Sequence, residues 1–107
     1  MTPYGLDNHT VKKKAELIFY ERINYEDGSI LEMKLWRVSS PVPSSAHEFK
    51  YSLFYGRPGV REIGYDNERG KGDHKHFRDI ETSYRFETVE KLIADFLSDV
   101  KTLRGGT

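Results

Sequence analysis

Hydrophobic and polar residues alternate along four stretches in the first two thirds of the chain. In residues 14–24, Ala15, Leu17 and Phe19 point to one side, whereas Glu16 and Tyr20 point to the other. A period of two is typical of a strand with one buried face. The same alternation predicts three more strands, at residues 29–38, 49–55 and 60–66.

Turn residues separate these predicted strands. The pair Asp27-Gly28 favours a two-residue hairpin loop between the first two strands. The run Gly56-Arg57-Pro58-Gly59 predicts a turn between the third and the fourth. Residues 39–46 contain two prolines and four serines and predict an extended loop. We therefore expect an antiparallel meander of two hairpins.

The periodicity changes near the end of the chain. Thr88 is suited to cap a helix, and Gly105 is suited to end it. Between them hydrophobic residues recur in steps of three and four: Val89, Leu92, Ile93, Phe96, Leu97, Val100 and Leu103. Tyr84 and Phe86 predict a brief fifth strand before this helix. The fold class expected is α+β, a four- to five-stranded antiparallel sheet with a C-terminal amphipathic helix packed on one face.

Composition limits the class of protein. The chain has 107 residues, which is the size of one small domain, and we expect a flexible N-terminal arm at 1–13 and a single α+β domain at 14–107. The 17 basic and 17 acidic residues cancel, which argues against unspecific coating of nucleic acid but leaves room for a local basic site. Cysteine is absent from the sequence, and no apolar run approaches the ~20 residues of a membrane span. We expect a cytoplasmic protein that does not enter a membrane.

One face of the expected sheet is not covered by the helix. Tyr20, Arg22, Trp36, Lys50 and Arg61 are placed to decorate it. Aromatic and basic side chains together would suit stacking on nucleic acid. The alternative is that aromatic residues simply favour strands and pack there.

The segment 65–77 is unusually polar and reads Tyr-Asp-Asn-Glu-Arg-Gly-Lys-Gly-Asp-His-Lys-His-Phe. We expect it to form a long loop held at both ends. If residues 74–76 are extended, His74 and His76 project from the same side, roughly 7 Å apart. They could then serve as base and acid in the cleavage of RNA through its 2′-hydroxyl, with Lys71 stabilising the charged phosphorane.

Neighbouring residues would complete such a ribonuclease site. Asp73 or Asp66 could orient one imidazole and fix its tautomer. Arg69 is expected to bind phosphate, and Asn67 and Tyr65 are placed with it as substrate-binding residues. This site would need no cofactor.

Two other interpretations of the segment remain open. In the first, His74, His76 and Asp66 hold a divalent metal, with Asp73 or His47 as other possible ligands, although spacing fixes no third ligand. In the second, the segment is a polar loop whose residues cap one another. His9 and His47 are expected to be ordinary surface residues.

Several runs of the sequence resemble the TumE-type toxins of bacterial toxin–antitoxin pairs, and together they cover most of residues 14–104. The most specific is the run from Tyr65-Asp66-Asn67 to His74-Lys75-His76. The others are Glu32-Met33-Lys34-Leu35-Trp36-Arg37-Val38, Pro41-Val42-Pro43 with Ser45 and His47, Tyr51-Ser52-Leu53-Phe54-Tyr55-Gly56, Tyr84-Arg85-Phe86, Ala94-Asp95-Phe96 and Asp99-Val100.

This resemblance implies a growth-inhibiting cytoplasmic toxin that is neutralised by a cognate antitoxin, often a helix-turn-helix protein. It implies no particular target or catalytic residue. Three hypotheses follow: a metal-independent RNA endonuclease, a metal-dependent nuclease, and a non-catalytic interaction protein that binds a partner through its aromatic sheet face.

Overall fold

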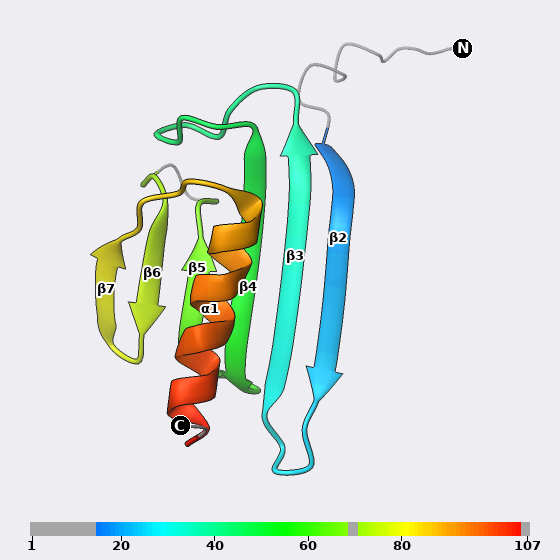
Figure 1. Cartoon of the computed structure of the whole chain (residues 1–107), viewed down its shortest axis with the longest axis vertical. Helices are drawn as coiled ribbons and strands as arrows, with labels where there is room; N and C mark the ends of the chain where they lie inside the picture. Colours follow the sequence, from blue (N-terminus) through cyan, green and yellow to red (C-terminus); the bar gives the residue numbers. More distant parts are fainter. Residues whose placement is uncertain (1–14, 69–70, 106–107) are drawn as a thin grey trace.

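Residues 15–68 and 71–105 are described by a computed structural model, and they form a curved antiparallel sheet with one helix against it (Figure 1). The strands are β2 (Ala15–Asn24), β3 (Ile30–Val38), β4 (Phe49–Arg57), β5 (Val60–Asp66), β6 (His74–Phe77) and β7 (Ile80–Ser83), and the helix is α1 (Val89–Leu103). Each strand pairs with the next strand in the sequence, so the sheet is a simple meander. The α+β prediction is confirmed. The predicted arm at 1–13 and Arg69 lie outside the described residues.

The core lies between the sheet and α1. Alternate residues in the middle of β3 and β4 and in the second half of β5 are buried on this side, and three residues of α1 meet them. They are Leu31, Met33, Leu35, Tyr51, Leu53, Tyr55, Ile63, Tyr65, Leu92, Phe96 and Val100. In Figure 1, α1 lies in front of β4 and β5, while β2 lies at the far edge of the sheet.

The helix begins and ends where the sequence indicates. The Thr88 side chain accepts a hydrogen bond from the Lys91 backbone N–H at 3.0 Å, and Gly105 has a positive φ of 82°. Tyr65 of β5 donates to Asp99 at 2.6 Å, which ties α1 to the sheet, and Tyr84 donates to Asp95 at 2.7 Å, which ties α1 to the segment after β7. Within the described residues no helix is both long and apolar enough to cross a membrane.

The segment predicted as a long loop forms more regular structure than expected. Its last part is strand β6, and β7 follows after a turn at Arg78 and Asp79. The sequence Arg78-Asp79 lacks the Asn-Gly or Asp-Gly signal of a two-residue hairpin loop. The positive φ of this turn, 57°, is taken by Arg78 instead of a glycine or an asparagine. The prediction of a fifth strand at Tyr84 and Phe86 is therefore corrected: the described residues form six strands, and these two aromatic residues follow the last one.

Candidate functional site

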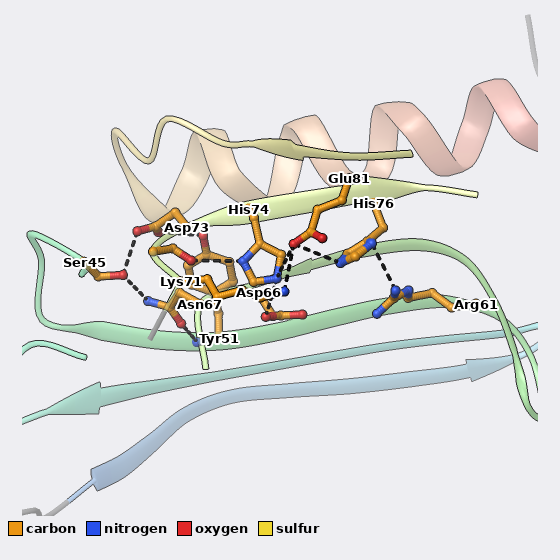
Figure 2. A network of polar contacts seen from close by, with 11 residues as sticks. Ser45, Tyr51, Arg61, Asp66, Asn67, Lys71, Asp73, His74, His76 and Glu81 are labelled. Atoms are coloured by element: carbon orange, nitrogen blue, oxygen red, sulfur yellow. Dashed lines mark hydrogen bonds and ion pairs between the residues drawn. The ribbon is translucent and has the colours of Figure 1, made fainter. Parts of the chain in front are cut away.

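Six polar side chains gather on the sheet face opposite α1, and we call them the histidine cluster: Arg61, Asp66, Lys71, His74, His76 and Glu81 (Figure 2). Strand pairing brings them together. His74 lies opposite Asp66 on β5, and His76 lies between Gly64 on β5 and Glu81 on β7. Because Tyr65 points into the core, its neighbour Asp66 must point to the other face, as do His74 and His76.

His74 is buried, with 7% of its side chain exposed, and both of its ring nitrogens face oxygen atoms. Nδ1 lies 3.0 Å from the Gly72 carbonyl oxygen, which can only accept, so Nδ1 donates. Nε2 lies 3.0 Å from Asp66 Oδ1 and 3.6 Å from Glu81 Oε2. A contact as short as the one to Asp66 is attractive only with a proton between the two atoms. The geometry therefore places His74 Nε2 where it can donate a proton-mediated contact to Asp66.

His76 has the opposite kind of partner. Its Nδ1 lies 3.0 Å from the Arg61 guanidinium, which can only donate, so Nδ1 accepts and the ring proton of the neutral imidazole is on Nε2. Burial and the nearby Arg61 charge lower the pKa of His76 below its ordinary value of 6.5. His76 is thus held neutral at pH 7.

Gly64 makes room for Arg61, and the two histidine rings are tilted against each other. Arg61 passes over Gly64, where a Cβ atom would lie only 2.6 Å from Arg61 Cδ. The rings of His74 and His76 lie edge to face with centroids 5.3 Å apart, closer than the roughly 7 Å expected from two strand steps. The predicted projection of both histidines from one side of an extended segment agrees with the structure, and the two rings pack against each other.

Lys71 and Glu81 lie at the outer side of the histidine cluster. Lys71 Nζ is 3.2 Å from Glu81 Oε2, and the same oxygen is 3.8 Å from His76 Nε2. The hydrogen bond from Lys71 lowers the pKa of Glu81, so this carboxylate is ionised. Both side chains are substantially exposed, at 58% for Lys71 and 39% for Glu81.

A second group of polar residues, the Asp73 network, lies at the end of the strands nearest the proline-rich loop: Ser45, His47, Tyr51, Asn67 and Asp73. Asp73 accepts hydrogen bonds from Ser45 at 2.7 Å and from Tyr51 at 2.6 Å, and His47 Nε2 lies 2.7 Å from the carboxylate oxygen that Tyr51 also contacts. Burial raises the pKa of Asp73, but these three hydrogen bonds outweigh burial and bring it below 3.8. The Asp73 carboxylate therefore connects the proline-rich loop to β4, and Asp66 is the carboxylate that lies beside His74.

The residues predicted to bind substrate are placed differently from that prediction. The Asn67 side chain is buried, accepts from the Tyr51 backbone N–H, and donates to Ser45 and to the Phe49 carbonyl. Tyr65 is 1% exposed and points toward α1. Both belong to the internal scaffold, because each polar atom already has a partner there. Arg69 is not among the described residues.

Sequence reasoning missed the roles of five residues: Arg61, His47, Ser45, Tyr51 and Glu81. His47, expected on the surface, has only 14% of its side chain exposed and stacks on Phe86 with centroids 3.8 Å apart. Its partner Asp73 lies 26 residues away, so no local pattern could connect them. Ser45 and Tyr51 join the network across similar distances, and Glu81 enters the histidine cluster through the unsignalled turn. The available signal for Glu81 was the pairing that a two-residue turn at residues 78 and 79 would give, because it puts Glu81 opposite His76.

The open face also carries the aromatic and basic side chains expected there. Tyr20 and Arg22 both donate to Glu32, at 2.9 Å and 3.3 Å. The Lys50 ammonium lies 4.9 Å from the centre of the Trp36 ring, directly across the β3–β4 pair. The histidine cluster and these residues therefore share one face of the sheet.

A divalent metal could draw on one group of described residues, formed by His74, His76 and Glu81, whose ligand atoms lie within 4.8 Å of one another. Glu81 replaces Asp66 as the third member expected from sequence. Two features oppose a cation here. Lys71 and Arg61 already bring positive charge to the group, and a metal on His76 Nε2 would place a proton on Nδ1, where Arg61 also donates.

Comparison with protein families decides the wider class of this chain. The family model described as Toxin TumE matches residues 3–104, nearly the whole sequence. The chain belongs to the TumE toxin family. Comparisons with curated proteins and with solved structures gave no match.

Membership in the TumE family gives the polar residues a context. The family is one of toxins, so the chain is assigned to the toxin component of a toxin–antitoxin pair, and a cognate antitoxin is its partner. The matched residues include both the histidine cluster and the Asp73 network. The family description names no reaction, and the chemistry must be argued from the geometry.

Proposed function

We propose that this TumE-family toxin is a metal-independent RNA endonuclease whose active site is the histidine cluster. The observation that carries the proposal is the opposite surroundings of two adjacent imidazoles. His74 faces two acceptors, the Gly72 carbonyl and the Asp66 carboxylate, and His76 is kept neutral by burial and by Arg61. Cleavage of RNA through its own 2′-hydroxyl needs one proton donor and one proton acceptor on a phosphate, which is this combination.

In the proposed reaction His76 is the base and His74 is the acid. His76 Nδ1 takes the proton of the 2′-hydroxyl, whose oxygen attacks phosphorus, while His74 gives its Nε2 proton to the departing 5′-oxygen. The products are a 2′,3′-cyclic phosphate and a 5′-hydroxyl. Arg61 is exposed and can turn from His76 to the phosphate, which frees the Nδ1 lone pair.

The remaining residues stabilise charge and geometry. Lys71 supplies a cation for the phosphorane, Asp66 orients His74, and the Gly72 carbonyl fixes the tautomer of the same ring. Arg69 stays a proposed phosphate-binding residue from its place in the sequence. Asp73 has a positioning part only, through the Asp73 network. Positive charge from Lys71 and Arg61 favours a phosphate over a metal, so cleavage should persist in excess chelator.

The test is RNA cleavage by purified variants together with growth inhibition on induced expression. His76→Gln, His74→Gln and Lys71→Ala should each lower the cleavage rate by about 10²-fold or more. His47→Gln is the matched control, because it alters a half-buried histidine of the Asp73 network. Its folded protein should cleave at nearly the parental rate even if it is less stable.

The proposal fails if the three cluster variants fold normally and remain fully toxic. Loss of cleavage on chelation, restored by a divalent metal, would support a metal-dependent nuclease instead. Toxicity with RNA left intact would favour a non-catalytic protein that binds a partner through Trp36, Lys50 and Tyr20 on the open face.

We further propose that the cognate antitoxin is a helix-turn-helix protein encoded beside the toxin. The family match supports an antitoxin of some kind. Co-expression of the neighbouring small protein should restore growth and give a stable complex on purification. A neighbour that restores growth without binding the toxin would contradict this part of the proposal.

A further inference from the structure

Glu81 is the point on which the donors of the histidine cluster converge. One oxygen, Oε2, is 3.2 Å from Lys71 Nζ, 3.6 Å from His74 Nε2 and 3.8 Å from His76 Nε2. Figure 2 shows this carboxylate reaching over the two rings from the neighbouring strand. The groups proposed to act on a phosphate are therefore already engaged with an anion of the protein itself.

The position of Glu81 makes this contact easy to break. Its strand, β7, has four residues, all of them exposed, and it pairs with β6 at the edge of the described sheet. The backbone of Glu81 is fixed opposite His76, but its side chain is 39% exposed. A change of rotamer is enough to move the carboxylate into water without disturbing the strand.

We propose that the Glu81 carboxylate occupies, in the free protein, the place where Lys71, His74 and His76 bind a phosphate group of RNA. The inference rests on the proposed function and adds a device that regulates the same site. Carboxylate and phosphate oxygens accept the same charge-assisted hydrogen bonds. Since the two anions repel each other and share the same donors, RNA must displace Glu81 before it can bind in the reactive position.

Glu81 has a competing interpretation as a catalytic carboxylate. It lies as close to the two histidines as a group that shuttles protons would lie. The two interpretations predict different effects of its removal. If Glu81 only occupies the anion site, its removal tightens anion binding and leaves RNA cleavage in place, whereas removal of a catalytic carboxylate abolishes cleavage.

The experiment measures anion binding apart from cleavage. The probes are inorganic phosphate and a DNA oligonucleotide, which lacks the 2′-hydroxyl and cannot be cleaved by this route. Binding is followed by the NMR signals of the histidine rings and by fluorescence anisotropy of labelled DNA. Glu81→Gln and Glu81→Ala should bind both probes about tenfold more tightly, since Lys71, His74 and His76 are released from the carboxylate.

Glu62→Gln is the matched control. Glu62 is also a carboxylate on this sheet, but its partner is Arg78 at 3.1 Å rather than the histidine cluster. The variant changes net charge by the same amount. Equal tightening in Glu62→Gln and Glu81→Gln would show a general charge effect and overturn the inference, as would unchanged or weaker binding in the Glu81 variants.

Cleavage assays on the same proteins separate this inference from the ribonuclease proposal. If the Glu81 variants bind anions more tightly and no form of the protein cleaves RNA, the occupied anion site stands and the ribonuclease proposal fails. If the parental protein cleaves RNA, while Glu81→Gln has lost cleavage at unchanged anion affinity, the ribonuclease proposal stands and Glu81 is a catalytic group.

Discussion

His74 and His76 are separated by one residue on a short strand, but their ring nitrogens face different chemical groups. A carbonyl oxygen and a carboxylate surround His74, and a guanidinium faces His76. The difference between them is therefore set by neighbours from β5 and from the bend at Gly72, not by the histidines themselves. Changes to those neighbours should move the chemistry in predictable directions.

Arg61→Gln should shift the pH dependence of RNA cleavage. Burial is the larger cause of the low pKa of His76, and the Arg61 charge is the second. Without that charge the pKa rises toward 6.5, so the neutral base is lost at a higher pH. The acidic limb of kcat/KM, which reports the free protein, should therefore move to higher pH. Arg78→Gln is the control, because Arg78 pairs with Glu62; a limb that stays in place in Arg61→Gln would contradict the role given to Arg61.

Asp73→Asn should reduce stability, and the loss should depend on pH. The folded pKa of Asp73 is below 3.8, so its charge stabilises the fold above pH 3.8 and that contribution disappears as pH falls further. At pH 7 we expect a loss of about 3 kcal/mol in the free energy of unfolding, from hydrogen bonds to a buried charge. Urea unfolding at neutral and acidic pH measures it.

The control for this change is Asp79→Asn in the exposed turn between β6 and β7. It should alter the free energy of unfolding by less than about 0.5 kcal/mol. A loss in Asp73→Asn that stays the same below pH 3.8 would mean that the carboxylate charge is not what stabilises the network.

At the scale of elements, the hairpins decide which residues meet. The sequence pattern was sufficient for β2 to β5 and α1, since period-two and period-3.6 patterns are local. It was also sufficient to put His74 and His76 on one side. It proposed Asp66 beside a histidine but could not choose it over Asp73. It could not place Arg61 or Glu81 around the histidines, because those contacts depend on the register across β5, β6 and β7. The contacts of the Asp73 network could not be predicted either, because they join the proline-rich loop to a bend far away in the sequence.

Gly72→Ala tests the bend that leads into β6. Gly72 has a φ of +83°, it is buried, and a Cβ atom would lie 3.1 Å from the Ser44 carbonyl oxygen. Its own carbonyl accepts from His74. We expect a loss of about 2 kcal/mol in stability and, in the protein that remains folded, slower cleavage because the His74 ring is displaced.

Gly28→Ala is the matched control for that bend. Gly28 has a similar φ of +89°, but a Cβ atom added there would meet nothing within 4 Å, so only backbone strain is added. Thermal unfolding and cleavage of the folded fraction should show a stability loss alone. If the two substitutions had the same effect on cleavage, the bend at Gly72 would not be what positions His74 for the reaction.

For the whole molecule, equal numbers of acidic and basic residues mean that attraction to RNA must come from local charge. Lys71 and Arg61 are the permanent cations of the histidine cluster. The logarithm of the affinity for single-stranded nucleic acid should fall with the logarithm of salt concentration, with a slope of about −1.4 for these two cations.

Lys71→Ala should make that slope shallower by about 0.7, the value for one phosphate contact on a single strand. Lys91→Ala, on α1 and paired with Asp95, should leave it unchanged. Fluorescence anisotropy over a range of salt concentrations measures both slopes. An equal change in the two variants would place the binding surface elsewhere.

The meander has a consequence for the order in which the protein acquires its properties during synthesis. Each strand pairs with the strand made just before it, and the contacts that build the histidine cluster come from β5, β6, β7 and the bend before β6. The helix is translated after all six strands, and it covers the opposite face. Helix α1 thus contributes to the core but supplies none of the contacts of the histidine cluster. Substitutions of core residues in α1 should change toxicity through the amount of protein that survives in the cell, and substitutions of the histidine-cluster residues should change it through what each surviving molecule does.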